Sequence, residues 1–522
     1  MGIESVSTIA DIIRTHAAER PDATALEVGD RSVTFAELHE RSNQVAHALA
    51  AAGVGVGDRV AFIDKNGLEW FEVTFALAKL GAVNVSVNWR LAAPEMRQII
   101  EDAQSEVVIV GPEFVAAIES IEGDLERVET IVAIGGHDRW PAYDDWVSSH
   151  PADDHGVTVG GSDVAFQLYT SGTTGLPKGV MLTNDNFFKG VTEVAAQWRF
   201  TPESVNLAMM PMFHIAGAGW GMIGLYFGCK NIVMRDIDPA AILKAIPEHR
   251  ITNAFMVPVV IQFLLITPGV EDTDFSSLQS IVYGASPITD DVLVKGIETF
   301  GCEFIQVYGL TETTGAITQL DGVDHDPENR PELLRSCGKP YPWVEFRVVD
   351  QSTGEDVPTG KVGELWTRSH QNMAGYWNNP EATAAAVTGD GWFKTGDAGF
   401  LDAEGFVFLH DRVKDMIVTG GENVYPAEVE NVLMRHPDVA DVAVIGVPDE
   451  RWGEAVKAIV VPAGDPAPDE AALIAFAREQ LAGFKLPKSV DFAETLPRNP
   501  SGKLLKRELR EPYWEGVDRR VG

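Results

Sequence analysis

The first 160 residues alternate between strand-like and helix-like patterns of apolar positions. The capping box at 34–37 (Thr-Phe-Ala-Glu) predicts a helix with apolar positions at Leu38, Val45 and Leu49. After it the pattern predicts, in chain order, a strand at 59–63, a helix at 70–80, a strand at 83–87, a helix at 94–103 that starts on proline, and a strand at 106–110. Strands and helices that alternate in this way predict a mostly parallel sheet covered on both faces.

The pattern changes near residues 411–415. Short strand-like segments with many turn residues come before this point, at 363–367, 391–397 and 405–410. Beyond it a compact α+β pattern follows, with a helix at 426–435, strands at 439–445 and 455–461, a helix at 469–481 and a strand at 489–492. Because 522 residues are too many for one hydrophobic core, we expect a large N-terminal α/β domain and a small C-terminal α+β domain.

The net charge and the cysteine content exclude several kinds of binding partner and site. The chain has 41 Lys and Arg against 77 Asp and Glu, a formal charge of −36. A field of this sign repels nucleic acids and anionic lipid heads, so an anion site must be locally basic or assisted by a metal ion. Cys229, Cys302 and Cys337 are too far apart for a disulfide framework or a metal cluster. With no signal-peptide pattern and no run of 18 apolar residues, we expect a cytoplasmic protein without a transmembrane segment.

The segment at 169–179, Tyr-Thr-Ser-Gly-Thr-Thr-Gly-Leu-Pro-Lys-Gly, carries the strongest chemical signal. It follows the apolar run at 164–169 and holds four small hydroxyl side chains, three glycines and Lys178. Small residues let backbone N–H groups approach an anion, and the lysine adds a positive charge. The spacing differs from the nucleoside-triphosphatase P-loop, because Lys178 lies three residues past Gly175. A plain turn before a strand at 178–182 is the alternative, and we favour a phosphate-binding loop.

This loop resembles the signature of the adenylate-forming superfamily, which comprises acyl-CoA synthetases, nonribosomal adenylation domains and beetle luciferases. In that family the loop holds the β- and γ-phosphates of ATP. Further matches follow in the family's order as far as residue 503, whereas the N-terminal 160 residues fit without carrying motifs. Signatures of serine hydrolases and zinc proteases are absent from the sequence.

The resemblance implies a nucleotide site and assigns roles within it. The implied ATP- and AMP-binding residues are Thr170, Ser171, Gly172, Thr173, Thr174, Gly175, Lys178, Gly284, Ala285, Ser286, Tyr308, Gly309, Thr311, Asp397 and Arg412. Tyr308 would lie against adenine, Thr311 near the α-phosphate, and Asp397 and Arg412 at the ribose. Glu312 would hold Mg²⁺, a hard cation that prefers carboxylate oxygen. Each segment alone also reads as an ordinary turn or a solvated strand end.

The C-terminal matches imply a mobile small domain. The resemblance divides the chain into a large domain at 1–411, a hinge at 412–416 that contains Lys414, and a small domain at 417–522. Lys503 would be catalytic together with Glu312 and Thr170, because charge accumulates at phosphorus as pyrophosphate leaves. A basic tail is the alternative for Lys503. Gly420, Gly421 and Trp452 would line the path of the CoA pantetheine, and a core tryptophan is the alternative for Trp452.

A glycine-rich segment occupies the position of the family's acyl pocket. The pocket residues that we expect are Phe213, His214, Gly217, Gly219, Gly221 and Val257. The segment at 213–216 has no acidic residue to pair with a substrate ammonium, which disfavours amino acids. Nearby methionines adapt to irregular apolar shapes, so we expect a medium- or long-chain fatty acid or a bulky apolar carboxylate. His214 could gate this pocket or belong to the core.

The resemblance therefore implies an AMP-forming acyl-CoA synthetase that uses ATP, Mg²⁺ and CoA. Carboxylate and ATP would give acyl-AMP and pyrophosphate, and rotation of the small domain would then admit CoA. Two alternatives remain open: an acyl-AMP ligase that loads a carrier protein, and a catalytically silent nucleotide-binding regulator. A luciferase-like oxygenase is less favoured. We expect small-molecule partners and no nucleic acid, and we allow for a homodimer.

Overall fold

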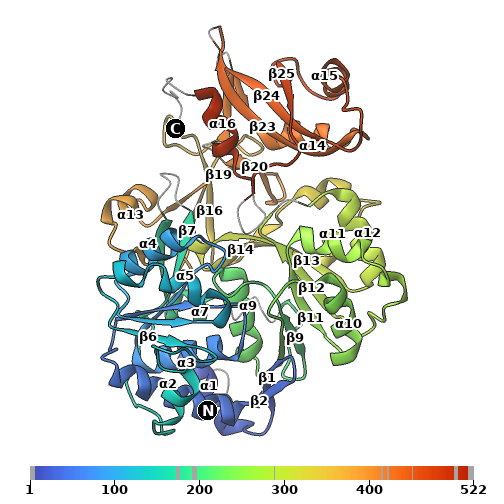
Figure 1. Cartoon of the computed structure of the whole chain (residues 1–522). Helices are drawn as coiled ribbons and strands as arrows, with labels where there is room; N and C mark the ends of the chain where they lie inside the picture. The colour runs from blue at the N-terminus through green and yellow to red at the C-terminus, as the bar shows by residue number, and fades with distance from the viewer. Residues whose placement is uncertain are drawn as a thin grey trace. The chain divides into compact units, whose positions relative to one another are not determined.

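A computed structural model describes residues 6–171, 177–190, 197–286, 288–412, 415–419, 422–449, 451–498 and 504–514 (Figure 1). Contacts divide the chain into two compact units. The first comprises Met1–Glu345 and Arg368–Phe393, and the second comprises Phe346–Thr367 and Lys394–Gly522. The residues at 394–412 thus group with the C-terminal part of the chain. This division lies earlier than the boundary expected from sequence, and the hinge at 412–416 stays a prediction.

The first unit contains a seven-stranded sheet with the order β18-β8-β7-β4-β3-β5-β6. Its strands are β3 (Arg59–Ile63), β4 (Val83–Ser86), β5 (Val107–Val110), β6 (Thr130–Ala133), β7 (Val164–Ser171), β8 (Pro177–Thr183) and β18 (Gly375–Tyr376). The strands from β7 to β6 pair in parallel, whereas β8 and β18 add antiparallel pairs at one edge. The expected mostly parallel sheet is confirmed.

The three predicted helices of this region are present, and their first residues lie within two positions of the predicted ones. Thr34 caps α2 (Phe35–Ala51) with both hydrogen bonds of the capping box, and Pro94 lies in the first turn of α4 (Ala93–Ala103). Helix α3 (Leu68–Leu80) is buried along its whole length, which explains its nearly continuous apolar sequence. On it, the Trp70 ring stacks on Phe166 of β7 with 6.2 Å between ring centroids. The core between helix and sheet thereby supports the strand that leads into the predicted phosphate loop.

A nine-stranded sheet completes the first unit, with the order β15-β14-β13-β12-β11-β9-β10-β1-β2. Its strands are β1 (Thr24–Val28), β2 (Arg31–Thr34), β9 (Val205–Ala208), β10 (Lys230–Val233), β11 (Asn253–Met256), β12 (Ser280–Gly284), β13 (Glu303–Leu310), β14 (Gly315–Leu320) and β15 (Lys339–Pro340). The central strands from β13 to β1 are parallel, and antiparallel strands form both edges. Carboxyl ends of parallel strands meet at one edge, where α/β proteins bind ligands.

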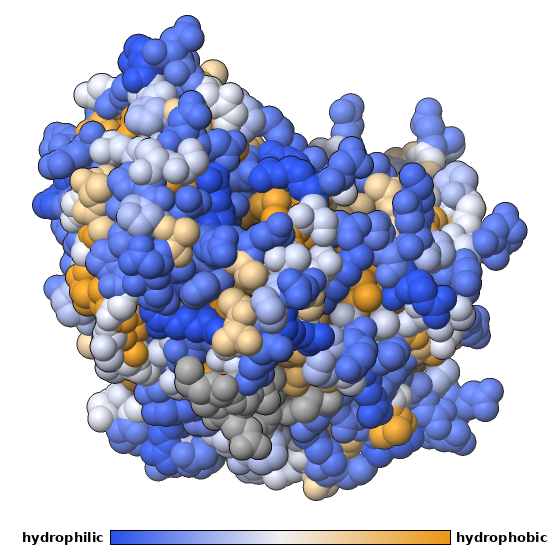
Figure 2. Space-filling view, turned by 90° about the horizontal axis from the view of Figure 1, so that it is seen from below, coloured by the Kyte–Doolittle hydropathy of each residue, from blue (hydrophilic) through white to orange (hydrophobic). Residues whose placement is uncertain are grey.

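Further helices of the first unit pack around these sheets (Figure 1). They are α1 (Ile9–Glu19), α5 (Val115–Glu119), α6 (Tyr143–Ser148), α7 (Asn184–Phe188), α9 (Ile215–Tyr226), α10 (Pro239–His249), α11 (Pro258–Ile266), α12 (Asp290–Phe300) and α13 (Pro380–Ala386). None of the helices within the described ranges is long and apolar enough to cross a membrane. The face seen in Figure 2 is mostly hydrophilic, with small, separate hydrophobic areas.

The second unit contains two sheets. One has the order β16-β17-β19-β20, with β16 (Glu345–Val349), β17 (Gly363–Arg368), β19 (Phe393–Leu401) and β20 (Val407–Arg412). The other contains β21 (Ile417–Thr419), β22 (Glu422–Val424), β23 (Val439–Asp449), β24 (Gly453–Pro462) and β25 (Ser489–Phe492), with helices α14 (Pro426–Leu433), α15 (Glu470–Arg478) and α16 (Lys506–Trp514). The C-terminal α+β pattern is thus confirmed.

Candidate active site

The predicted phosphate loop connects two antiparallel neighbours, β7 and β8. Thr170 pairs with Lys178 and Ser171 with Pro177 across the hairpin. Gly172, Thr173, Thr174 and Gly175 lie outside the described residues. Both ends of the loop are therefore fixed by strand pairing, and Lys178 is the second residue of β8.

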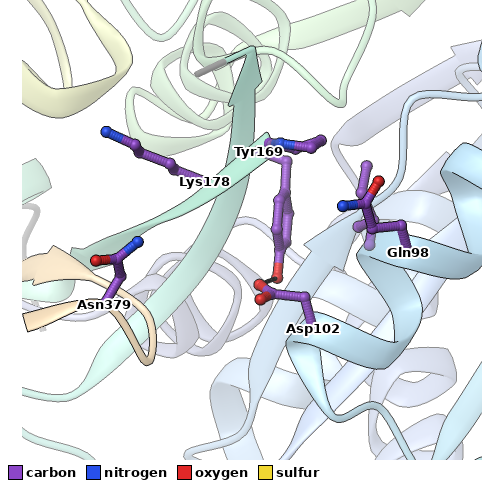
Figure 3. Close-up of a pocket in the computed structure, with 7 residues that line it drawn as sticks. Gln98, Asp102, Tyr169, Lys178 and Asn379 are labelled. Carbon is purple, nitrogen blue, oxygen red and sulfur yellow. Dashed lines mark hydrogen bonds between the residues drawn. The ribbon is translucent and has the colours of Figure 1, made fainter. Parts of the chain in front are cut away.

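Lys178 also borders a cavity of about 150 Å³ (Figure 3). On its far side the Tyr169 hydroxyl donates a hydrogen bond of 2.6 Å to Asp102 Oδ2. Burial and that carboxylate raise the pKa of Tyr169, so its proton stays in this bond. The Lys178 side chain extends away from Asp102 in Figure 3, and no ion pair of Lys178 occurs among the described residues. Its ammonium is thus available for an anion from outside the chain.

Glu312 lies in a short 3-10 helix, η5 (Thr311–Thr313), that follows β13 directly. The Thr313 hydroxyl accepts a hydrogen bond of 2.9 Å from the Leu310 amide, which closes this turn. The Met373 amide donates to the Glu312 carbonyl at 2.8 Å, and the Tyr376 hydroxyl donates to Glu312 Oε1 at 3.0 Å. Both the backbone and the carboxylate of Glu312 are therefore fixed by other segments.

Tyr376 connects Glu312 to Lys178, a contact that sequence reasoning missed. Strand β18 pairs with β8 so that Tyr376 lies opposite Val180. The Lys178 ammonium lies over the Tyr376 ring, 4.9 Å from its centroid. The available signal was an aromatic pair after glycine, Gly375-Tyr-Trp, in a turn-rich segment. One side chain thus contacts both of the charged residues that the resemblance assigns to the phosphates and Mg²⁺.

The ends of β12 and β13 bring the expected adenine-binding residues together. The two strands are parallel neighbours, with Gly284 opposite Val307. A Cβ on Gly284 would collide with the Val307 carbonyl oxygen, so only glycine fits this approach. Ala285 has a left-handed backbone with φ of 67°. Such strain in an alanine is typical of functional sites.

The remaining residues of this group lie at the same sheet edge. Tyr308 is buried and Ser286 is exposed. A Cβ on Gly309 would collide with the carbonyl oxygen of Gly315, so β13 and β14 approach closely there. Thr311 follows one residue after β13 ends. The structure therefore brings Gly284, Ala285, Ser286, Tyr308, Gly309 and Thr311 to one sheet edge, and their contact with the nucleotide stays a prediction.

The expected ribose residues lie in the second unit. Asp397 in β19 and Arg412 in β20 are direct partners across an antiparallel pair. Asp397 is buried, and its amide donates a hydrogen bond of 3.1 Å to the Thr395 hydroxyl. Sequence reasoning assigned these two residues to one sugar, and the register makes them neighbours. Their approach to the nucleotide stays a prediction.

Trp452 is the described member of the expected CoA path. Its side chain is 42 % exposed, which argues against the core alternative. The next residue, Gly453, pairs with Thr419, directly before the Gly420-Gly421 pair. Trp452 therefore lies close in register to the glycine loop. Gly420 and Gly421, the expected hinge residue Lys414 and the expected catalytic residue Lys503 lie outside the described residues.

His214 precedes helix α9, at the start of the expected acyl pocket. Its ring packs 4.6 Å from the Phe213 ring, which contacts Trp89 edge-on at 6.0 Å. Burial, together with the Arg90 charge, lowers the pKa of His214 to about 4, so the imidazole is neutral near pH 7. Its Nε2 atom is buried without a hydrogen-bond partner in the described part of the chain. A core histidine would normally be hydrogen-bonded, so this favours a role toward a ligand.

The three glycines of α9 that we expect in the acyl pocket, Gly217, Gly219 and Gly221, face different surroundings. A Cβ on Gly217 would collide with the Pro211 carbonyl oxygen, and one on Gly221 would lie 3.3 Å from the Phe71 ring. These two glycines permit close packing and do not line open space. Gly219 is also buried, yet a Cβ there would meet only Ile215 Cδ1, at 3.8 Å. Val257 precedes α11 and packs against the core beside it.

This contrast predicts opposite effects on stability. Gly217→Ala is expected to destabilise the protein by about 1–3 kcal/mol, because backbone must move to admit the methyl group. Gly219→Ala is expected to be neutral or to stabilise by up to about 1 kcal/mol, since alanine favours a helix over glycine. Thermal unfolding of the two variants beside wild type measures the difference. Equal losses of stability in both variants would contradict the inference that a methyl group fits at Gly219.

The donors present fit a magnesium ion held jointly with substrate phosphates. No cluster of three His, Cys, Asp or Glu suited to a metal occurs within the described ranges. Mg²⁺ usually binds through one or two carboxylates plus phosphate oxygens and water, not in a cage made by protein alone. Glu312 lies directly after β13, and the Tyr376 hydroxyl fixes its carboxylate. It could therefore be the single carboxylate that binds Mg²⁺ together with phosphate oxygens.

The sequence of the chain matches a known enzyme family and several characterised relatives. A family model described as AMP-binding enzyme matches residues 13–377, and the model of its C-terminal domain matches residues 428–503. The chain is 41 % identical to the fatty acid–acyl-carrier-protein ligase ScoC of Streptomyces coeruleorubidus, over 99 % of this chain and 98 % of ScoC. It is 37 % identical to the long-chain-fatty-acid–CoA ligase FadD13 of Mycobacterium tuberculosis, over 93 % and 94 % of the two chains.

A solved structure is similar to this protein over nearly the whole length of both chains. The crystal structure of ATP-bound MatB from Rhodopseudomonas palustris superposes with a TM-score of 0.87 at 32 % identity. The match covers 97 % of this chain and 99 % of MatB. Similarity therefore extends over both units and includes the N-terminal 160 residues, in which sequence reasoning found no motif.

Proposed function

The chain belongs to the family of AMP-binding enzymes and is an AMP-forming acid–thiol ligase, and we propose that it is an ATP-dependent acyl-CoA synthetase. It would convert a carboxylic acid, ATP and CoA into acyl-CoA, AMP and pyrophosphate through an acyl-adenylate. The observation that carries this proposal is the arrangement of Lys178, Tyr376 and Glu312 at the mouth of the predicted phosphate loop. It offers one cation for phosphate oxygens and one fixed carboxylate for a metal.

In the first half-reaction a carboxylate oxygen of the substrate attacks the α-phosphorus of ATP, and pyrophosphate leaves. Lys178 would bind the terminal phosphates, and Thr170 and Thr311 would donate hydrogen bonds to the nucleotide. Mg²⁺, when bound through Glu312, neutralises phosphate charge. Lys503 would contact both the entering carboxylate and the α-phosphate, where negative charge accumulates.

In the second half-reaction the CoA thiolate attacks the acyl carbonyl carbon, and AMP leaves with the bonding electrons. We propose that the small domain rotates about Lys414 between the two steps. Lys503 would move away, and Gly420, Gly421 and Trp452 would line the entry of pantetheine. The exposed ring of Trp452 and its register beside Thr419 support this placement.

For the acyl group we propose a medium- or long-chain fatty acid or a bulky apolar carboxylate. Phe213, the neutral His214 and the space beside Gly219 support an apolar pocket that begins at the start of α9. Ile215 lies close to both Gly219 and Gly315. Gly315 begins β14 and pairs with Leu310, the last residue of β13, so the expected pocket lies beside the end of β13. A panel of carboxylates from C2 to C20, with benzoates and sterol acids, scored by CoA-ester yield, tests the assignment.

Gly219→Trp is expected to shift substrate preference toward short acids by about tenfold or more in the ratio of kcat/KM values. The indole would fill the space that a longer acyl chain needs, and a packed site does not expand readily. The measurement is kcat/KM for a short and a long acid in wild type and variant. Gly221→Phe is unsuitable as a pocket probe, because its ring would meet Phe71. An unchanged ratio in Gly219→Trp would place the acyl pocket elsewhere.

A carrier protein is the second candidate acceptor, and the 41 % identity to ScoC favours it. Both acceptors present the same pantetheine thiol, so the reacting residues would be shared. Synthetic acyl-AMP is offered to the enzyme with CoA in one reaction and with a phosphopantetheine-bearing carrier protein in another. Faster thioester formation on CoA supports the synthetase, and faster formation on the carrier supports the ligase.

A further inference from the structure

We propose that Tyr376 is a positioning residue that fixes the Glu312 carboxylate and keeps it apart from the Lys178 ammonium. The inference rests on the proposed function, because its consequence is tight binding of MgATP. Tyr376 contacts both groups at once, with its hydroxyl 3.0 Å from Glu312 Oε1 and its ring face 4.9 Å from Lys178 Nζ. Its side chain is only 8 % exposed, so solvent has little access to either contact.

The hydrogen bond sets the direction of the carboxylate. A hydroxyl that donates to Oε1 fixes the rotation of the whole group, and therefore the direction of Oε2. Hydrogen bonds to a charged acceptor are stronger than those between neutral groups. Without this bond Glu312 would have to be ordered when a cation binds, and that ordering would weaken binding.

The ring face acts on the lysine. An ammonium over a tyrosine ring is attracted by the ring's negative face, which holds Lys178 without a carboxylate partner. Lys178 and Glu312 carry opposite charges and flank the same side chain, yet no ion pair joins them in the described part of the chain. Such a pair would occupy the groups needed for phosphate and metal. Tyr376 therefore keeps the Lys178 ammonium and the Glu312 carboxylate apart, so that each group can bind its own part of MgATP.

The backbone around Tyr376 is anchored independently of its hydroxyl. Its amide donates to the Thr383 hydroxyl at 2.9 Å, and the Trp377 amide donates to the Gly179 carbonyl at 2.8 Å. The Arg59 guanidinium stacks 3.3 Å from the centroid of the Trp377 ring. Removing the hydroxyl alone should consequently leave strand β18 in place, so Tyr376→Phe isolates its effect.

The test is a double-mutant cycle in equilibrium binding of ATP by calorimetry, with and without Mg²⁺, in the full-length protein. Tyr376→Phe is expected to weaken Mg²⁺-dependent ATP binding about tenfold, as for a lost hydrogen bond to a charged group. Binding without Mg²⁺ should change less than twofold, because the ring over Lys178 remains. In a Glu312→Ala background, Tyr376→Phe should change neither affinity. Tyr376→Leu should weaken ATP binding in both conditions.

Tyr143→Phe is the matched control. Its hydroxyl donates to Glu72 Oε2 at 2.8 Å inside the core of the same unit, away from the residues assigned to the nucleotide. This variant should lose thermal stability while its ATP affinity stays unchanged. An unchanged Mg²⁺-dependent affinity in Tyr376→Phe, or an equal loss in the Glu312→Ala background, would overturn the positioning role alone. Wild-type protein that binds no ATP would overturn the proposed function and this inference with it.

Discussion

Glu312→Gln lowers the rate of acyl-adenylate formation by about 100-fold or more in our account. The amide keeps the shape of the side chain, and its oxygen can still accept the Tyr376 hydrogen bond seen at 3.0 Å. What disappears is the negative charge that, in the proposed mechanism, would hold the cation between phosphates. The measurement is pyrophosphate release with saturating carboxylate at several Mg²⁺ concentrations.

Glu303→Gln provides the control for that variant. Glu303 begins the same strand, β13, and its carboxylate pairs with Arg199 at the surface. Removing this charge should leave the adenylation rate within about twofold, since exposed ion pairs contribute little. A near-normal rate in Glu312→Gln would remove Glu312 from the metal site.

Lys503→Ala separates the two half-reactions. The variant should lose acyl-adenylate formation by about 100-fold or more, because the charge that stabilises the transition state at phosphorus is gone. It should still convert supplied acyl-AMP and CoA into thioester, since AMP needs no such help to leave. Two assays are run on each variant: pyrophosphate release, and thioester formation from synthetic acyl-AMP.

Gly421→Leu should show the opposite behaviour, because its side chain would obstruct the pantetheine path. Lys414→Pro should resemble Gly421→Leu, since proline fixes φ at the expected pivot. Arg507→Ala, which removes an exposed positive charge four residues after Lys503, serves as the control and should retain both activities. If Lys503→Ala and Gly421→Leu lose both activities equally while folded, the alternating-domain mechanism is wrong.

Local signals in the sequence were sufficient for much of the fold. The capping box at Thr34 and the continuous apolar run of β3 determine those elements through neighbours in sequence, and their observed bounds match. The hairpin of β7 and β8 around the predicted phosphate loop could also be predicted from residues that are neighbours in sequence. Strands β9 to β11 were not predicted, although they form the centre of the nine-stranded sheet. They are short and buried, and short apolar runs do not distinguish strand from helix.

Residues that depend on distant contacts were harder to predict. Tyr376 belongs to a two-residue strand, which has no periodic pattern, and its partner strand lies some two hundred positions earlier in the chain. Three glycines of α9, Gly217, Gly219 and Gly221, were assigned to the pocket together, because a sequence does not say what each helix face meets. In the structure a Cβ on Gly217 or Gly221 would meet neighbouring atoms at 3.3 Å or less, whereas a Cβ on Gly219 would meet Ile215 Cδ1 at 3.8 Å. The division by contacts falls at the start of β19, whereas the sequence suggests a boundary after β20, because β20 pairs with β19 and both strands group together.

The central claim is that this chain joins a carboxylate to AMP, and carboxylate-dependent exchange of labelled pyrophosphate into ATP tests it most directly. The exchange reports reversible adenylation without regard to the thiol acceptor. We predict Mg²⁺-dependent exchange with at least one medium- or long-chain or bulky apolar acid, and none with amino acids. Failure of exchange with every acid of the panel, in protein that binds ATP, would contradict the account.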